Sequence, residues 1–133
     1  MTAHIQRFDS NDYLSEITIF NHVVYLAGQV PNTDTADIHT QTKEVLDNID
    51  AMLAKANSDK SRLLTAQIFI KDLADFAVVN SMWGDWLADC PKPTRATVKA
   101  ELVNPLWKLE IVVVAAQNTI CLLYTSPSPR DKR

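Results

Sequence analysis

The sequence predicts an α+β domain in which two helices pack on one face of a five-stranded sheet. Extended and helical patterns follow one another along the chain in the order ββαβαββ. The extended runs are rich in β-branched residues, and in the helical runs apolar residues recur every three or four positions. Each helix has one apolar stripe to bury, which places both helices on the same side of the sheet.

The first half of the chain predicts a hairpin, a long helix and a third strand. The hairpin strands are Glu16–Phe20 and Val23–Val30, with Asn21-His22 between them. From Asp34 to Ala56 the apolar residues follow a helical period, and Leu63–Ile70 returns to an extended pattern.

The second half predicts a helix and a second hairpin. The helix begins with Asp72 as its cap and ends before the break at Cys90-Pro91. Two extended runs follow, Thr94–Val103 and Lys108–Ala116, and Asn104-Pro105 between them indicates a turn. The last run is apolar on both faces, so we expect it to be covered on both sides.

The earlier of these two runs carries the most informative polar residues. Its side chains alternate, with Arg95 and Thr97 on the face opposite Ala96 and Val98. A guanidinium beside a covered sheet is costly to desolvate unless an anion meets it. We expect both residues to share the sheet face that the helices leave open with Glu110, the one acid of the last strand. A face that is partly apolar and partly charged indicates an oligomer interface.

Glu110 has two interpretations. In a hairpin centred on Asn104-Pro105 it pairs with Lys99, about 13 Å from Arg95 at about 3.3 Å per residue. The structural interpretation is a cross-strand ion pair with Lys99. The functional interpretation brings Arg95 and Glu110 together through a bulged register or across a subunit interface.

Composition narrows the class of protein. The 133 residues suffice for one domain with a core, and the net charge of -3 without a basic patch argues against a nucleic-acid partner. The three histidines are scattered, so we expect no metal site, and no apolar run is long enough to span a membrane. We expect a cytoplasmic protein without a disulfide framework. The only glycines, Gly28 and Gly84, are expected where a side chain does not fit.

The C-terminal residues differ in character from the rest. Cys121–Asp131 reads CLLYTSPSPRD and resembles the translated end of a transposase-type sequencing adapter. We therefore predict a domain over residues 1–117 and a disordered, non-native tail over residues 118–133, with the natural chain ending near Ala116–Ile120.

Four segments resemble the RidA family, also called YjgF, and within it the YoaB-like branch. The segments are YLAGQVP (Tyr25–Pro31), IFIKDLADFAVVN (Ile68–Asn80), PTRATV (Pro93–Val98) and NPLWKLEIVVVAA (Asn104–Ala116). The resemblance implies a chorismate-mutase-like fold and a homotrimer with active sites between subunits. It also implies hydrolytic deamination of enamine and imine intermediates, such as 2-aminoacrylate, to 2-oxo acids and ammonia, without a cofactor.

The resemblance assigns roles to single residues. The family's essential arginine, which binds the substrate carboxylate, falls on Arg95, and its water-positioning glutamate falls on Glu110. The glycine of the first hairpin is Gly28, and Thr97 stands where the best-known members have cysteine.

Two positions depart from the family pattern. Leu14 stands where members often have tyrosine, with Tyr13 beside it, and Ala27 stands where many have serine. These changes leave carboxylate binding intact and bear on the substrate range.

Three functions compete. The first is an imine and enamine deaminase. The second is a non-catalytic trimer that binds small carboxylates as a sensor or scaffold, which keeps Arg95 but needs no Glu110. The third is a hydrolase dedicated to one pathway, as RutC-like members suggest for pyrimidine breakdown.

Overall fold

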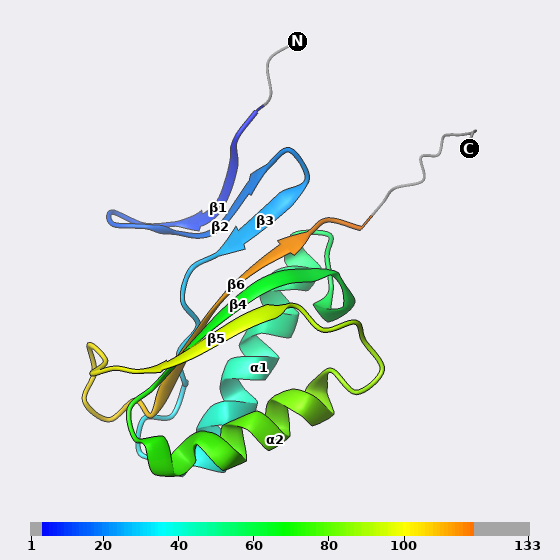
Figure 1. The fold of residues 1–133 in the computed structure, drawn as a ribbon. Coiled ribbons are helices and arrows are strands. Elements are labelled where there is room, and N and C mark those ends of the chain that lie inside the picture. Colours follow the sequence, from blue (N-terminus) through cyan, green and yellow to red (C-terminus); the bar gives the residue numbers. More distant parts are fainter. Residues whose placement is uncertain (1–3, 119–133) are drawn as a thin grey trace.

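The computed structural model describes residues 4–118 (Figure 1). The predicted tail over residues 118–133 lies outside the described residues except for Asn118, whose N–H donates to Asn57 O (2.7 Å). Two helices lie on one side of a six-stranded mixed sheet, which confirms the predicted α+β class. The elements are β1 (Gln6–Ser10), β2 (Ser15–Phe20), β3 (Val23–Leu26), α1 (Ile38–Lys55), β4 (Leu63–Ile70), α2 (Phe76–Trp86), β5 (Thr94–Lys99) and β6 (Leu109–Ala116). Short 3-10 turns, Lys60–Arg62 and Leu73–Asp75, precede β4 and α2.

Strand β1 is an addition to the five predicted strands. It pairs antiparallel with β2, with Gln6 opposite Ile19. All five of its side chains are exposed, so no buried face imposes the alternation of polar and apolar residues that marks a strand in sequence.

The predicted hairpin between the last two strands is wrong. The sheet order is β1-β2-β3-β6-β4-β5, so β4 separates β5 from β6. Strand β5 pairs with β4 in parallel, with Ala66 opposite Arg95, and α2 makes the crossover between them. The N–H of Ala100 still donates to the Ile70 carbonyl (3.0 Å), after which residues 101–108 carry the chain across the end of β4.

Helix α1 is fixed at its start and along its inner stripe. The Asp37 side chain accepts a hydrogen bond from the Thr40 N–H (2.9 Å) and caps the first turn. Val45, Ile49 and Leu53 are fully buried against the sheet. Complete burial of such a side chain contributes about 1.5–3 kcal/mol, so this stripe rather than helix propensity holds α1 in place.

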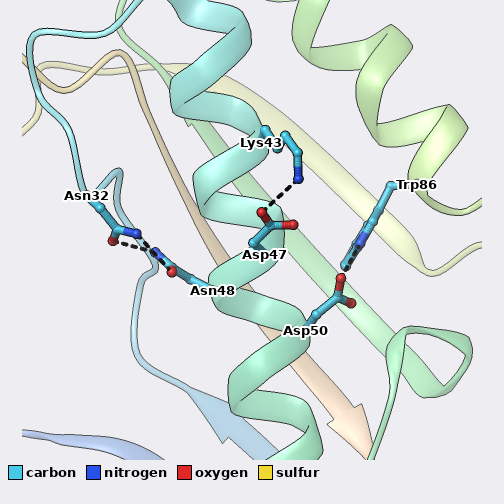
Figure 2. A network of polar contacts seen from close by, with 6 residues as sticks. All are labelled: Asn32, Lys43, Asp47, Asn48, Asp50 and Trp86. Atoms are coloured by element: carbon cyan, nitrogen blue, oxygen red, sulfur yellow. Dashed lines mark hydrogen bonds and ion pairs between the residues drawn. The ribbon is translucent and has the colours of Figure 1, made fainter.

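Polar contacts join α1 to its neighbours (Figure 2). The indole N–H of Trp86 donates to Asp50 (3.1 Å) and ties the end of α2 to α1. Asn48 donates to Asn32 (3.0 Å), which anchors the loop that enters α1.

The core lies between the helices and the sheet, and the other side of the sheet is open. On β6, Leu109, Ile111, Val113 and Ala115 are buried on the helix side. The alternate residues point the other way. This open face is made by Glu110, Val112 and Val114 of β6, Thr65, Gln67 and Phe69 of β4, Ala96 and Val98 of β5, and Thr18 and Tyr25 of β2 and β3.

Candidate active site

Arg95 lies on the edge strand β5 and faces the helices. It stands opposite Ala66, whose side chain is buried in the core, and its Nη1 donates to Oδ1 of Asn80 on α2 (2.8 Å). The expectation that Arg95 and Thr97 share the open face is wrong. Alternation shows which residues share a face but not which face the helices cover, and β5 is largely exposed on both.

Thr97 is two residues further along the same face, opposite Ile68. Its hydroxyl oxygen is buried, and within residues 4–118 it has no hydrogen-bond partner. A buried polar group without a partner costs about 1–3 kcal/mol. Thr97 therefore keeps an unused donor two positions from the exposed guanidinium.

Glu110 lies on the open face in contact with Gly28. A Cβ at Gly28 would stand 1.9 Å from Glu110 Oε2 and 2.9 Å from its Cδ. The Gln29 N–H donates to Ile111 O (2.8 Å), and the Ile111 N–H donates back to Gln29 O (3.0 Å), which fixes this approach. The predicted pairing with Lys99 is wrong, because Glu110 stands opposite Phe69 of β4.

Gly28 and Ala27 lie where the strand pairing is irregular. Tyr25 pairs with Val114 of β6, and Gln29 pairs with Ile111. The two pairings are four residues apart on the β3 side and only three residues apart on β6. The extra residue makes a β-bulge, a device that redirects side chains beside functional sites. The Ala27 N–H is directed away from β6 and donates to Glu16 O (2.9 Å).

The surroundings of Glu110 alter its acidity. Burial raises the pKa of the Glu110 carboxyl above its ordinary value. In the described part of the chain no side chain or backbone N–H donates a hydrogen bond to the carboxylate, although the group is only half-buried. A carboxylate that is desolvated and unpaired is a stronger base than an exposed one.

Leu14 lies far from Arg95 in the sheet. It ends a tight turn in which the Asn11 side chain accepts from the Leu14 N–H (3.0 Å), directly before β2. Leu14 is 47% exposed and Tyr13 beside it 93% exposed. Strands β3, β6 and β4 stand between β2 and β5.

The family model described as Endoribonuclease L-PSP matches residues 4–117. The chain belongs to this family, also known as RidA or YjgF. The predicted membership is thereby confirmed.

Two curated relatives and one solved structure illustrate the similarity. A RutC family protein of Haemophilus influenzae is 49% identical over 112 residues, which cover 84% of this chain and 97% of the relative. The RutC family protein YoaB of Escherichia coli K12 is 43% identical over the same shares. A crystal structure of a YjgF family member from Neisseria meningitidis has a TM-score of 0.82 and 36% identity, covering 86% of this chain and 96% of that one.

In this RidA-family chain the candidate residues form two groups. The arginine half-site consists of Arg95, Thr97 and Asn80, and the glutamate half-site of Gly28, Ala27 and Glu110. Arg95 of β5 and Val113 of β6 both pair with Ala66 of β4, so Arg95 is two strand spacings from β6. Glu110 is three residues from Val113 along β6. These offsets, about 10 Å across the strands and about 10 Å along them, separate the two half-sites by about 14 Å.

The half-sites also lie on opposite faces of the sheet, so one chain does not bring Arg95 and Glu110 to one small substrate. Asn80 was not predicted from sequence, because a single asparagine on a helix gives no spacing pattern.

Over residues 4–118 no three His, Cys, Asp or Glu side chains gather closely enough to hold a metal ion. The helices within this range are also too short or too polar to cross a membrane.

Proposed function

We propose that the protein is a hydrolase of the 2-iminobutanoate and 2-iminopropanoate deaminase type. It converts cytoplasmic enamine and imine intermediates, such as 2-aminoacrylate, to 2-oxo acids and ammonia. Membership of the RidA family supports this function. The observation that carries it is the unpaired, partly desolvated carboxylate of Glu110 held against Gly28, because imine hydrolysis needs a base for water and no metal.

Arg95 is proposed to bind the substrate carboxylate. The guanidinium fork matches a carboxylate with two parallel, charge-assisted hydrogen bonds. Nη1 of Arg95 donates a hydrogen bond to Oδ1 of Asn80 (2.8 Å), which holds the plane of the guanidinium. The Thr97 hydroxyl oxygen is buried within the chain, so no direct contact with the substrate is proposed for it.

Glu110 is proposed to act as general base and then as general acid. It takes a proton from water as the water oxygen attacks the electrophilic carbon of the C=N bond. It returns this proton to the nitrogen to give the carbinolamine. It then takes the hydroxyl proton of the carbinolamine and passes it to the nitrogen, so that the C=O bond forms, the C–N bond breaks and ammonia leaves. A raised pKa suits both steps, because the group holds and releases a proton more readily near neutral pH.

A homotrimer is part of the proposal. Arg95 and Glu110 of one chain are too far apart for one substrate, so a complete site takes Arg95 from one subunit and Glu110 from another. The open face supplies apolar surface for such an assembly, with Val98 43% and Tyr25 46% exposed. Sedimentation equilibrium should give a trimer, and a stable monomer at micromolar concentration would contradict the shared site.

Ribonuclease activity, which the family description names, has less support in this chain. Phosphate contacts need clustered Lys and Arg, and the net charge is -3.

The deciding experiment is a coupled assay. A threonine dehydratase generates the imine, semicarbazide competes for it, and the rate of 2-oxobutanoate release is followed as the protein is titrated. A deaminase raises the rate in proportion to its concentration. Unaltered kinetics favour the carboxylate-binding trimer, and so does a Glu110→Gln variant that behaves as wild type while Arg95→Ala loses binding. Activity confined to another class of imine or amide favours a pathway-dedicated hydrolase.

A further inference from the structure

A cavity of about 790 Å³ opens at the end of the molecule where β4 and β5 terminate. None of the residues of the two half-sites lines it. Its walls come from the loop before α1, the turn after β4, the end of β5 and the loop before β6. The lining residues are Asp34, Thr35, Ala36, Lys71, Asp72, Asp75, Lys99, Pro105, Leu106 and Lys108.

A buried glutamine holds two of these walls together. Gln41 of α1 is fully buried, and its Nε2 donates to the carbonyls of Ala36 (3.0 Å) and Leu106 (3.2 Å). Its Oε1 accepts the N–H of Lys108 (2.8 Å). The Lys71 ammonium donates to the Pro105 carbonyl and adds the third wall. Hydrogen bonds within the chain therefore join three walls of the cavity.

Charges of both signs line the cavity without neutralising one another. Three lysines and three aspartates face it. The ion pairs of residues 4–118, Lys43–Asp47 and Lys55–Asp9, both lie elsewhere. In the same part of the chain the ammonium groups of Lys99 and Lys108 donate no hydrogen bond, and Asp75 makes no cap bond with its side chain. Unpaired opposite charges across one cavity favour a ligand that carries both.

The ends of two helices add positive electrostatic potential near the cavity. Helices α1 and α2 both begin at this end of the molecule, beside the ends of β4 and β5 (Figure 1). The positive end of each helix dipole favours an anion. Asp34 accepts a hydrogen bond from the Asn104 side chain (3.1 Å) and Asp72 accepts one from the Ala74 N–H (2.9 Å). Asp75 makes no cap bond, which leaves its carboxylate to meet an organic cation.

We propose that this cavity binds a free α-amino acid, with its carboxylate against Lys99 and Lys108 and its ammonium against Asp75. The site is separate from the proposed active site, because Lys99 lies four residues beyond Arg95 on β5, about 13 Å away. The volume is in the range of about 300–1,000 Å³ that small-molecule sites occupy, which leaves room for a side chain.

The test is a titration of the full chain with free amino acids, followed by calorimetry and by amide NMR. Saturable binding is expected, with shifts at Lys71, Lys99 and Lys108. Lys99→Gln and Asp75→Asn should each weaken it about tenfold or more, as expected for a lost charged contact. Lys55→Gln is the matched control, because Lys55 lies at the other end of α1, about 25 Å from its start. It should bind as wild type.

Two ligand analogues and one variant decide the class and place of the ligand. The N-acetylated amino acid and the amino acid amide each lose one charge and should bind about tenfold or more weakly. Binding should persist in Arg95→Ala, which separates this site from the proposed catalytic one. The proposal is overturned if no amino acid saturates below about 10 mM, if the acetylated analogue binds equally well, or if Arg95→Ala abolishes binding.

Discussion

The carboxylate of Glu110 occupies the space that a side chain at position 28 would need. A Cβ built on Gly28 lies 1.9 Å from Glu110 Oε2, far inside van der Waals contact. No glycine in residues 4–118 has a positive φ, so Gly28 is required for space and not for backbone conformation. The β-bulge at Gly28 and the carboxylate on β6 form one unit.

Gly28→Ala should therefore impair catalysis more than folding. The new methyl group displaces the end of a flexible side chain, not backbone, so the chain still folds. A base moved by about 1 Å costs up to about 100-fold in rate, and we expect kcat/KM to fall at least tenfold. Steady-state kinetics and a melting curve measure the two effects.

Gly84→Ala is the matched control. The sequence-based expectation that Gly84 also lacks room is wrong, because a Cβ there meets nothing within 4 Å. In the interior of α2, alanine should raise the free energy of unfolding by about 0.5–1 kcal/mol and leave activity unchanged. Equal activity in both alanine variants would show that Gly28 does not set the position of Glu110.

The raised pKa of Glu110 predicts a pH-dependent stability change. The folded chain binds the Glu110 proton more tightly than the unfolded chain does, so ionisation costs stability as the pH rises through 4.5 and above. Glu110→Gln removes that cost and should raise the melting temperature at pH 7, with the gain disappearing below about pH 4. Glu101→Gln, at an exposed acid, is the control for loss of one charge. A less stable Glu110→Gln protein at pH 7 would mean that the assembled protein pairs the carboxylate.

The same pKa predicts the acid limb of the activity profile. Glu110 must be ionised to accept a proton from water, so kcat/KM should fall as the pH drops through an apparent pKa above 4.5. In Glu110→Gln this limb should be absent and kcat should be lowered more than KM is changed. A wild-type profile that is flat down to pH 4.5, or a variant that keeps the limb, excludes Glu110 as the base.

Substitutions of Arg95 test its proposed contact with the substrate carboxylate. Arg95→Lys keeps the charge but loses the fork and the bond to Asn80. One lost charge-assisted bond of about 1.5–3 kcal/mol lowers kcat/KM by about 10- to 100-fold. Arg95→Ala should abolish deamination in an intact trimer, because Arg95 is exposed in the chain. A trimer that dissociates on size-exclusion chromatography, with any intact fraction active, would instead make Arg95 a structural ion-pair residue.

The sequence predicted the elements better than their arrangement. Strands β4 and β6 could be predicted because every second side chain is apolar and buried, as at Ile68, Ile111 and Val113. Helix α1 could be predicted because its buried apolar residues recur every three or four positions. The pairing of β5 does not follow, because a turn at Asn104-Pro105 is compatible with a hairpin or with a crossing over β4. The sheet face on which Arg95 lies was predicted wrongly for the same reason. It depends on which strand pairs with β5, and α2 makes the crossover that places β5 beside β4.

The candidate site shows the same limit. Arg95, Glu110 and Gly28 could be named from motifs, but the contact between Gly28 and Glu110 needs the bridge of Gln29 with Ile111, which no local pattern encodes. The separation of Arg95 from Glu110 is likewise a property of strand order.

Mixing inactive subunits tests the shared site most directly. Arg95→Ala keeps Glu110, and Glu110→Gln keeps Arg95, so neither homotrimer has a complete site. In an equal, refolded mixture, a site with one residue from each of two neighbouring subunits should be intact in about a quarter of cases. We expect about a quarter of wild-type activity in the mixture by the coupled assay. A mixture that never exceeds either parent would show that Arg95 and Glu110 do not act together across subunits.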